Sequence, residues 1–219
     1  MMKIHHWPEG HLQVCQDFIL TDLEIRTTLR CMMNRRAIAL GLVAAWAFAS
    51  QAGAASVGGV EFADRYEWNG TALRLHGAGV LRFKVFLEGY AAALYLGEGV
   101  HPDQSLEDVP RRLEIEYLWS IPADAFARAT LEQIRRNVDE ATLARLRSSI
   151  NRLNELYTSV EPGDRYALTY VPGVGTELAL NGEPRGRIEG AEFSRAVFAI
   201  WLGRKPVDEP LRQQLLAGS

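Results

Sequence analysis

Residues Gly77 to Glu98 read GAGVLRFKVFLEGYAAALYLGE, a stretch that is apolar along almost its whole length and contains no proline. A long apolar run of mixed β-branched and aromatic residues, interrupted by glycines, predicts buried sheet rather than helix. Arg82 lies in the first half of this run. Because a guanidinium keeps its charge in a protein, an arginine inside a sheet requires an anion, a carbonyl or a phenol as its partner.

The composition limits the classes of protein to which the chain can belong. Its 219 residues, 47% of them hydrophobic, suit one globular domain with a substantial core. The formal net charge of -3 and the lack of a basic stripe argue against a nucleic-acid partner. Cys15 and Cys31 are the two cysteines, so a disulfide framework or a cysteine zinc site further along the chain is excluded. We expect no cofactor and no metal, because the sequence contains none of the common nucleotide, nucleophile or metal-ligand motifs.

The N-terminal part has the pattern of a targeting segment. Arg35 and Arg36 precede an apolar stretch of about 13 residues, and the small residues at 52–54 form a cleavage site. This stretch is shorter than the roughly 20 residues that a spanning helix requires, so an uncleaved anchor is the weaker alternative. We expect residues 1–32 to be a misassigned or disordered extension, residues 33–54 to be a signal peptide, and residues 55–219 to be one periplasmic or secreted domain without a membrane span.

Alternating hydropathy and turn residues predict the order of elements in this domain. The expected strands are residues 60–62, 71–76, the stretch from Gly77, 111–119, 166–171 and 176–180, with a polar turn at 64–70 and hairpin turns at Asn69-Gly70 and Asn181-Gly182. In the strand at 111–119 we expect Arg112, Glu114 and Glu116 to lie on a solvated face. The expected helices begin near Pro122, Asp139, Phe193 and Asp208. This order predicts an α+β fold in which helices cover one face of an antiparallel sheet.

Arg82 is the first candidate for a functional residue. It precedes Tyr90 by eight residues, so in an unbroken strand both side chains would point to the same face. A guanidinium beside a phenol in an apolar setting can receive a carboxylate or a polarised carbonyl oxygen. The alternative is that Arg82 pairs with a carboxylate of the protein while Tyr90 fills the core, and the spacing leaves both interpretations open.

Four motifs in order resemble the bacterial chalcone isomerase-like family. They are Gly-Ala-Gly-x-x-Arg from Gly77, Tyr-Ala-Ala-Ala-Leu-Tyr-Leu from Tyr90, residues 170–182 and residues 198–208, and they span essentially the whole domain. The resemblance implies an open-faced β-sandwich with a layer of helices. It also implies that Arg82 stands where the plant isomerases use an arginine to stabilise an enolate. Tyr90 stands where related plant fatty-acid-binding proteins place a tyrosine beside the ligand carboxylate.

The other positions of the isomerase site differ in this chain. By the same resemblance, Phe126 and Gln133 replace the tyrosine and asparagine of the enzyme, Ala129 replaces its lysine, and Ile200 replaces its threonine. Loss of these groups favours binding over catalysis. The resulting hypothesis is a pocket for a fatty acid or similar acidic amphiphile, headed by Arg82 and lined by Tyr90, Phe126, Gln133 and Ile200. The alternatives are an intramolecular lyase that acts on a chalcone-like aromatic enone, with Arg82 as electrophilic stabiliser, and a structural role with Arg82 paired internally.

Overall fold

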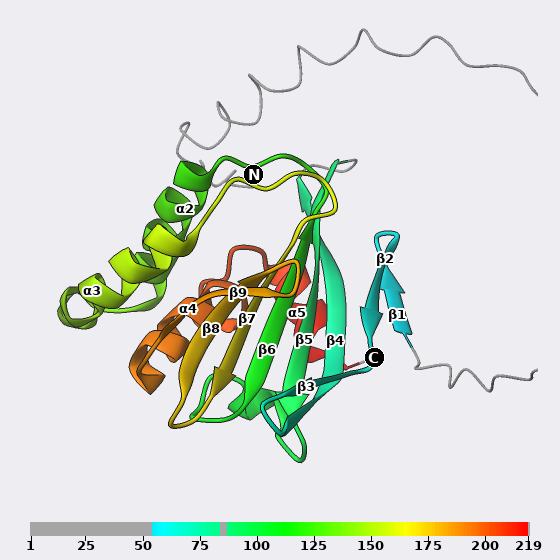
Figure 1. Cartoon of the computed structure of the whole chain (residues 1–219), viewed down its shortest axis with the longest axis horizontal. Helices are drawn as coiled ribbons and strands as arrows, with labels where there is room; N and C mark the ends of the chain where they lie inside the picture. The colour runs from blue at the N-terminus through cyan, green and yellow to red at the C-terminus, as the bar shows by residue number, and fades with distance from the viewer. Residues whose placement is uncertain (1–53, 84–86, 219) are drawn as a thin grey trace, which may run out of the picture. The chain divides into compact units, whose positions relative to one another are not determined.

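The computed structural model of the chain describes residues 54–83 and 87–218. The predicted extension at 1–32 and almost all of the predicted signal peptide at 33–54 lie outside this range. Seven antiparallel strands form one curled sheet in the order β3-β4-β5-β6-β7-β8-β9 (Figure 1). Their bounds are β3 Arg65–Trp68, β4 Thr71–Phe83, β5 Leu87–Gly97, β6 Arg111–Tyr117, β7 Arg165–Val171, β8 Gly175–Leu180 and β9 Glu183–Ile188. A separate hairpin consists of β1 (Ala54–Val57) and β2 (Val60–Ala63).

Both predicted Asn-Gly turns join neighbouring strands. Asn69 and Gly70, between β3 and β4, have φ angles of 47° and 80°, and Asn181 and Gly182, between β8 and β9, have φ angles of 52° and 84°. Two successive positive φ angles are the geometry of the type I′ turn, whose twist matches that of the flanking strands. The expectation of a turn over the whole of residues 64–70 was wrong, because this segment contains strand β3.

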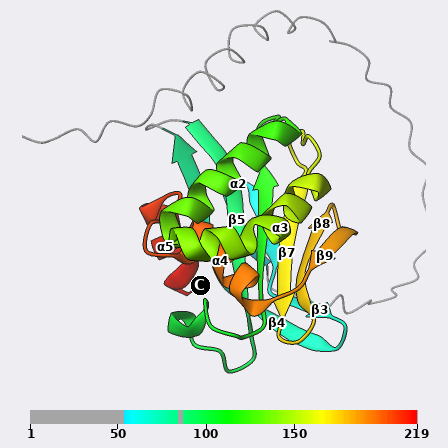
Figure 2. The ribbon, with the colours of Figure 1, turned by 90° about the vertical axis from the view of Figure 1, so that its left-hand side faces the viewer.

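The helices are α2 (Ala123–Asn137), α3 (Glu140–Leu156), α4 (Ala191–Leu202) and α5 (Glu209–Leu216), with a short 3₁₀ helix η1 at Pro102–Gln104. The side chains of Asp139 and Asp208 accept hydrogen bonds from the backbone N–H groups of Thr142 and Leu211, so both predicted N-caps are confirmed. Figure 2 shows α2, α3 and α4 in front of the sheet. The predicted α+β class, an antiparallel sheet covered by a layer of helices, is confirmed.

The stretch from Gly77 to Glu98 forms two strands, not one. It comprises most of β4, the three residues at 84–86 that the structure does not describe, and β5. In the β4–β5 register Leu81 pairs with Tyr90 and Arg82 pairs with Glu88, with a register shift between the two pairs. The expectation that Arg82 and Tyr90 share one face was wrong, because the two residues belong to different strands and the partner of Tyr90 is Leu81. Neighbouring residues of a strand point to opposite faces, so Arg82 points away from the face of Leu81 and Tyr90.

Helix α5 packs directly on β4, and two glycines of the Gly-Ala-Gly motif permit this contact. A Cβ atom at Gly77 would lie 2.5 Å from the backbone oxygen of Leu215, and one at Gly79 would lie 2.7 Å from the Cβ atom of Gln214. The side chain of Gln214 also accepts a hydrogen bond of 3.0 Å from the backbone N–H of Val80. The motif is therefore a helix-docking site within a strand.

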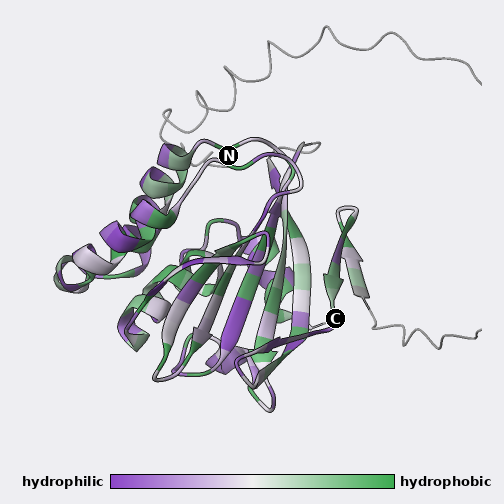
Figure 3. Cartoon of the chain, viewed as in Figure 1, coloured by the Kyte–Doolittle hydropathy of each residue, from purple (hydrophilic) through white to green (hydrophobic). Residues whose placement is uncertain are grey.

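The two faces of the sheet have different covers. The main core lies between the sheet and the helices, whereas a second cluster on the opposite face forms where the β1–β2 hairpin inserts Val60 and Phe62 against β4 and β5. Figure 3 shows hydrophilic residues along β6 in the middle of the sheet. The expected solvation of this face was wrong for Arg112 and Glu114, which are only 4% and 6% exposed, while Glu116 is half-buried. The guanidinium of Arg112 lies under the ring of Tyr66 on β3 and pairs with Glu114.

Candidate functional site

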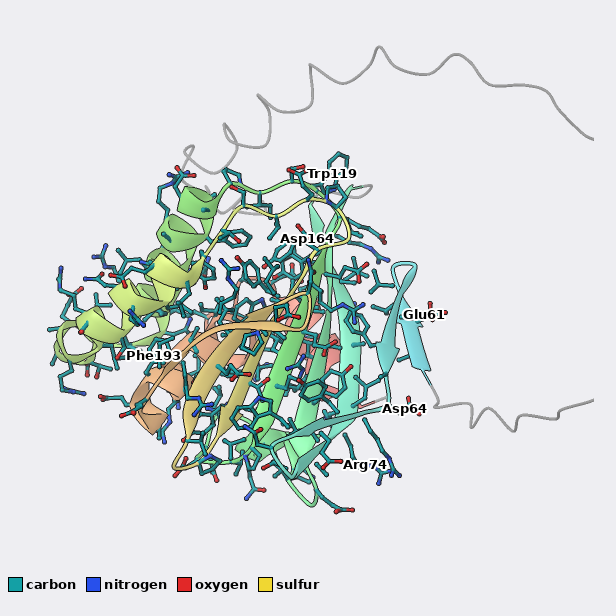
Figure 4. All side chains as sticks on the ribbon, in the orientation of Figure 1. Glu61, Asp64, Arg74, Trp119, Asp164 and Phe193 are labelled. Carbon is teal, nitrogen blue, oxygen red and sulfur yellow. The ribbon has the colours of Figure 1, made fainter. Side chains whose placement is uncertain are left out.

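Aromatic side chains gather at one end of the helix-covered face. The ring of Tyr117 on β6 meets Tyr90 of β5 at 5.9 Å, Phe126 of α2 at 5.3 Å and Tyr166 of β7 at 6.1 Å, each in an edge-to-face arrangement. Phe126 also stacks on Tyr157, with ring centroids 5.2 Å apart. Figure 4 shows the end of the sheet at which this cluster lies, marked by Trp119 and Asp164, and the opposite end, marked by Arg74.

The hydroxyl groups of this aromatic cluster have unequal hydrogen bonding. The Tyr166 hydroxyl accepts from the backbone N–H of Thr158 at 2.8 Å and donates to its carbonyl at 3.0 Å. The Tyr90 hydroxyl accepts from Trp201 Nε1 at 2.9 Å, and its own hydrogen has no acceptor in the part of the chain that the structure describes. The Tyr117 hydroxyl makes no hydrogen bond among the described residues, so Tyr90 and Tyr117 are the members of the cluster that can still donate to a polar ligand group.

Burial keeps the phenols of Tyr90, Tyr117 and Tyr157 protonated. Burial raises the pKa of Tyr90, although the hydrogen bond from Trp201 opposes the shift. Burial also raises the pKa of Tyr117 well above its usual value and that of Tyr157 to about 12. A charged phenolate is disfavoured away from water. The cluster therefore offers neutral hydrogen-bond donors within an apolar wall.

The other predicted site residues belong to the same layer. Phe126, Gln133 and Ile200 lie on α2 and α4, which pack against each other. Gln133 and Ile200 are buried, and Phe126 is half-buried against the core. The Oε1 atom of Gln133 accepts a hydrogen bond of 3.4 Å from Arg136. The structure thus brings Tyr90, Phe126, Gln133 and Ile200 to one face of the sheet, while their role in binding stays a prediction.

Arg82 does not join this group. Its side chain is 61% exposed and forms an ion pair with Glu88, in which Nη2 and Oε1 are 3.1 Å apart. The Nε atom donates to the same oxygen at 3.3 Å. The expectation of a buried Arg82 was wrong, because Glu88 on the facing strand supplies an anion at the solvent-exposed end of the β4–β5 pair. A ligand-binding role for Arg82 stays a prediction.

The buried arginine of the helix-covered face is Arg111, which sequence reasoning missed. It begins β6 and has no solvent exposure. Its guanidinium carbon lies 4.7 Å from the ring centroids of both Tyr170 and Phe198. Burial lowers its pKa to about 10, although the nearby Tyr170 and Asp108 oppose the shift. The available signal was the Arg111-Arg112 pair at the start of an alternating strand, since one of two neighbouring residues must face the core.

Within residues 54–83 and 87–218, no group of three or more His, Cys, Asp or Glu side chains is arranged to hold a metal ion. None of the helices in that same range is both long enough and apolar enough to cross a membrane.

Comparisons with known proteins agree with this architecture. The sequence model of the family described as chalcone isomerase-like matches residues 54–217. The chain therefore belongs to the chalcone isomerase-like family. No curated protein sequence matches the chain.

One similar solved structure is a fatty-acid binding protein of Arabidopsis thaliana. The two structures superpose with a TM-score of 0.59 at 13% sequence identity, over 75% of this chain and 96% of the plant protein. At this identity the likeness establishes a shared fold.

Proposed function

We propose that the domain at residues 55–219 binds a small amphiphile, a fatty acid or a similar acid with an apolar body, between the sheet and helices α2 and α4. The observation that carries the proposal is the Tyr90 hydroxyl. This hydroxyl accepts from Trp201 and keeps its own hydrogen available inside a layer of aromatic and aliphatic side chains. Ligand sites typically combine apolar walls with a few placed polar groups.

Two further observations support the proposal. A solved structure that shares the fold is a fatty-acid binding protein. In addition, Phe126 and Ile200 present hydrocarbon, not hydroxyl groups, to the layer that holds Tyr90. Such walls suit an alkyl chain or an aromatic ring better than the polar groups of a flavonoid.

Arg82 has a place in this proposal as a rim residue. Arg82 and Glu88 form the register pair next to Leu81 and Tyr90. Strand β3 pairs only with residues 71–74 of β4, so within the described residues no strand of the sheet pairs with β4 on that side at Arg82. At this edge the long side chain of Arg82 can exchange the carboxylate of Glu88 for that of a ligand, because an exposed ion pair contributes little stability.

We also propose that the domain is exported. The support is the pattern of residues 33–54, in which a pair of arginines precedes an apolar stretch and a small-residue cleavage site. The test is to express the full chain with its natural leader, fractionate the cells and measure the N-terminus of the mature protein by mass spectrometry. A mature chain that begins near residue 55 in the exported fraction supports the proposal, and a chain retained in the cytoplasm with its leader contradicts it.

The binding proposal is tested with a matched pair of probes, dodecanoic acid and dodecanol, titrated against residues 55–219 by calorimetry. We expect the acid to bind and Tyr90→Phe to weaken its binding several-fold, because one hydrogen bond contributes about 0.5–1.5 kcal/mol. We expect Arg82→Ala to weaken binding of the acid but not of the alcohol. Tyr66→Phe, which removes a phenol hydroxyl on the other face, is the control.

The outcomes of this titration separate the hypotheses. If neither probe binds and native mass spectrometry finds no co-purified small molecule, the binding proposal fails. If Arg82→Ala binds the acid as tightly as the wild type, Arg82 has the structural role that its pairing with Glu88 suggests. Turnover of a 2′-hydroxychalcone that disappears in Arg82→Ala would instead support the isomerase hypothesis.

A further inference from the structure

Arg111 is a buried cation whose surroundings do not neutralise it directly. It has no solvent exposure, and no carboxylate of the described residues lies within ion-pair distance of it. The nearby Asp108 is exposed and accepts a hydrogen bond from the Tyr170 hydroxyl instead. Because burying an unpaired charge is costly, such a site is a place to look for a missing anion.

The hydrogen-bond inventory of Arg111 locates the free donors. The Nη1 atom donates to the backbone oxygens of Glu107 and Val109, and Nη2 donates to Ser194 Oγ at 2.6 Å. The Nε–H group is buried and has no partner in the described structure. In a guanidinium, Nε–H and one hydrogen of Nη2 point the same way and form a fork that fits a carboxylate.

Ser194 extends this fork. Its hydroxyl accepts from Arg111 and is itself buried, and its own hydrogen has no acceptor in the part of the chain described by the structure. The residue lies in the first turn of α4, where the positive end of the helix dipole favours a negative charge. A buried donor without a partner is rare in proteins and calls for an ion or a water molecule.

A second orphaned polar atom lies in the same row of the sheet. Arg111 pairs with Tyr170, and Tyr170 pairs with Thr176, so the three side chains share the helix-covered face. The hydroxyl of Thr176 is buried and has no hydrogen-bond partner in the described structure. The row of Arg111, Tyr170 and Thr176 therefore contains two buried polar atoms without hydrogen-bond partners, Arg111 Nε and Thr176 Oγ1. Both atoms would be satisfied by a polar group or ion bound beneath α4.

We propose that the Nε–H side of Arg111 and the hydroxyl of Ser194 form a buried site for a small monovalent anion, either a free ion such as chloride or the carboxylate of a bound amphiphile. The site lies at the opposite end of the sheet from Tyr90. The rows of Arg111 and Tyr117 are six residue steps apart along β6, about 20 Å at the usual rise of a strand. In its carboxylate form the proposal rests on the proposed function for the amphiphile but moves its head group from Tyr90 and Arg82 to Arg111, whereas the free-ion form is independent of the proposed function.

The direct test is diffraction from crystals of residues 55–219 soaked in sodium bromide. We expect an anomalous peak within hydrogen-bond distance of Arg111 Nε and Ser194 Oγ. In solution, an anion at ten times its Kd should raise the ratio of folded to unfolded protein about 11-fold by mass action. Thermal unfolding at rising bromide concentration measures this effect, and Ser194→Ala should lose most of it while Ser148→Ala on the exposed face of α3 should not.

Arg111→Met removes the guanidinium itself. If this variant does not fold, Ser194→Ala still tests the proposal, because it leaves the guanidinium in place. A water molecule instead of bromide beside Nε, or the same anion dependence in Ser194→Ala as in the wild type, would overturn the proposal. Protein freed of small molecules and then saturated with dodecanoic acid or dodecanol separates the two anion sources. If only the acid removes the bromide peak, its head group occupies the Arg111 site rather than the Tyr90 end of the sheet. If neither probe binds, the proposed function fails while the bromide result still decides the anion site.

Discussion

Gly77 allows helix α5 to approach the backbone of β4 more closely than any residue with a side chain would permit. Replacing Gly77 by alanine would place a Cβ atom 2.5 Å from the Leu215 backbone oxygen, so α5 must move away. We expect a loss of about 1–3 kcal/mol in the free energy of unfolding, as for other overpacked sites. Urea denaturation of Gly77→Ala measures this loss. The control is Ala72→Ser, on an exposed part of the same strand, which should change the unfolding midpoint very little. An unchanged midpoint in Gly77→Ala would show that α5 does not pack on β4 at this position.

Single residues whose conformation is decided locally could be predicted from the sequence. The Asn-Gly pairs and the N-caps Asp139 and Asp208 depend on neighbours within three residues, and all were found where expected. The choice between Arg82 and Arg111 as the buried arginine depends on distant parts of the chain. Glu88 neutralises Arg82 across a hairpin, whereas α4 covers Arg111 from a position more than 80 residues away.

The N-terminal strands are attached to the outer face of the sheet by stacked cations. The guanidinium of Arg165 lies 4.8 Å from the ring centroid of Phe62 on β2. Those of Arg112 and Arg187 lie 3.6 Å and 5.3 Å from Tyr66 and Trp68 on β3. Each of these arginines also pairs with a glutamate of the sheet. The aromatic rings thus shield ion pairs that would otherwise lie in solvent.

Phe62 anchors this cover. Its side chain has no solvent exposure and packs in the cluster formed by Val80, Ala91 and Tyr95. We expect Phe62→Ala to lower the free energy of unfolding by about 3–5 kcal/mol, the usual cost of deleting a buried phenylalanine. Guanidinium denaturation measures the change.

Glu61 provides a matched control on the same strand. It is exposed, and its contact with Arg165 is made by its backbone oxygen, which the substitution Glu61→Ala retains. This variant should therefore unfold within about 0.5 kcal/mol of the wild type. Equal midpoints for the Phe62 and Glu61 variants would mean that the β1–β2 hairpin adds no stability to the sheet.

The strands and helices were predicted better than the segments that cover their faces. The two-residue alternation of hydropathy and the flanking turn residues indicate that residues 111–117 form a strand with two distinct faces. They do not indicate what covers each face, and for this reason the buried Arg112 and Glu114 were expected to be solvated. Strand β3 was missed for a related reason, because it has only four residues, two of them charged, and is ordered by its pairing with β4.

The whole molecule should lose stability in alkaline solution, because burial raises the pKa of five of its seven tyrosines. The five are Tyr90, Tyr95, Tyr117, Tyr157 and Tyr170. For Tyr157 and Tyr170 the pKa rises to about 12. Between pH 10 and 12 the unfolded chain therefore releases these protons while the native state keeps them. Each such tyrosine lowers the free energy of unfolding by about 1.4 kcal/mol per pH unit.

Urea denaturation from pH 8 to pH 11.5 measures this decline, and the absorbance of tyrosinate follows ionisation of the native protein. We expect the free energy of unfolding to be steady below pH 9.5 and to fall steeply above pH 10. Ionisation of most tyrosines of the folded protein near pH 10, without loss of structure, would contradict the burial of the aromatic cluster.

The docking of α5 on β4 has a consequence for the order of folding. From β3 to β9 every strand pairs with its neighbour in the sequence, so the sheet can grow by successive local pairings. The hydrogen bond from Val80 to Gln214 instead joins residues 134 positions apart. During synthesis α5 cannot cover the glycine-lined surface of β4 until the last residues of the chain have left the ribosome. A chain that stops before α5 would present this bare strand, with its unsatisfied Val80 N–H group, to other chains.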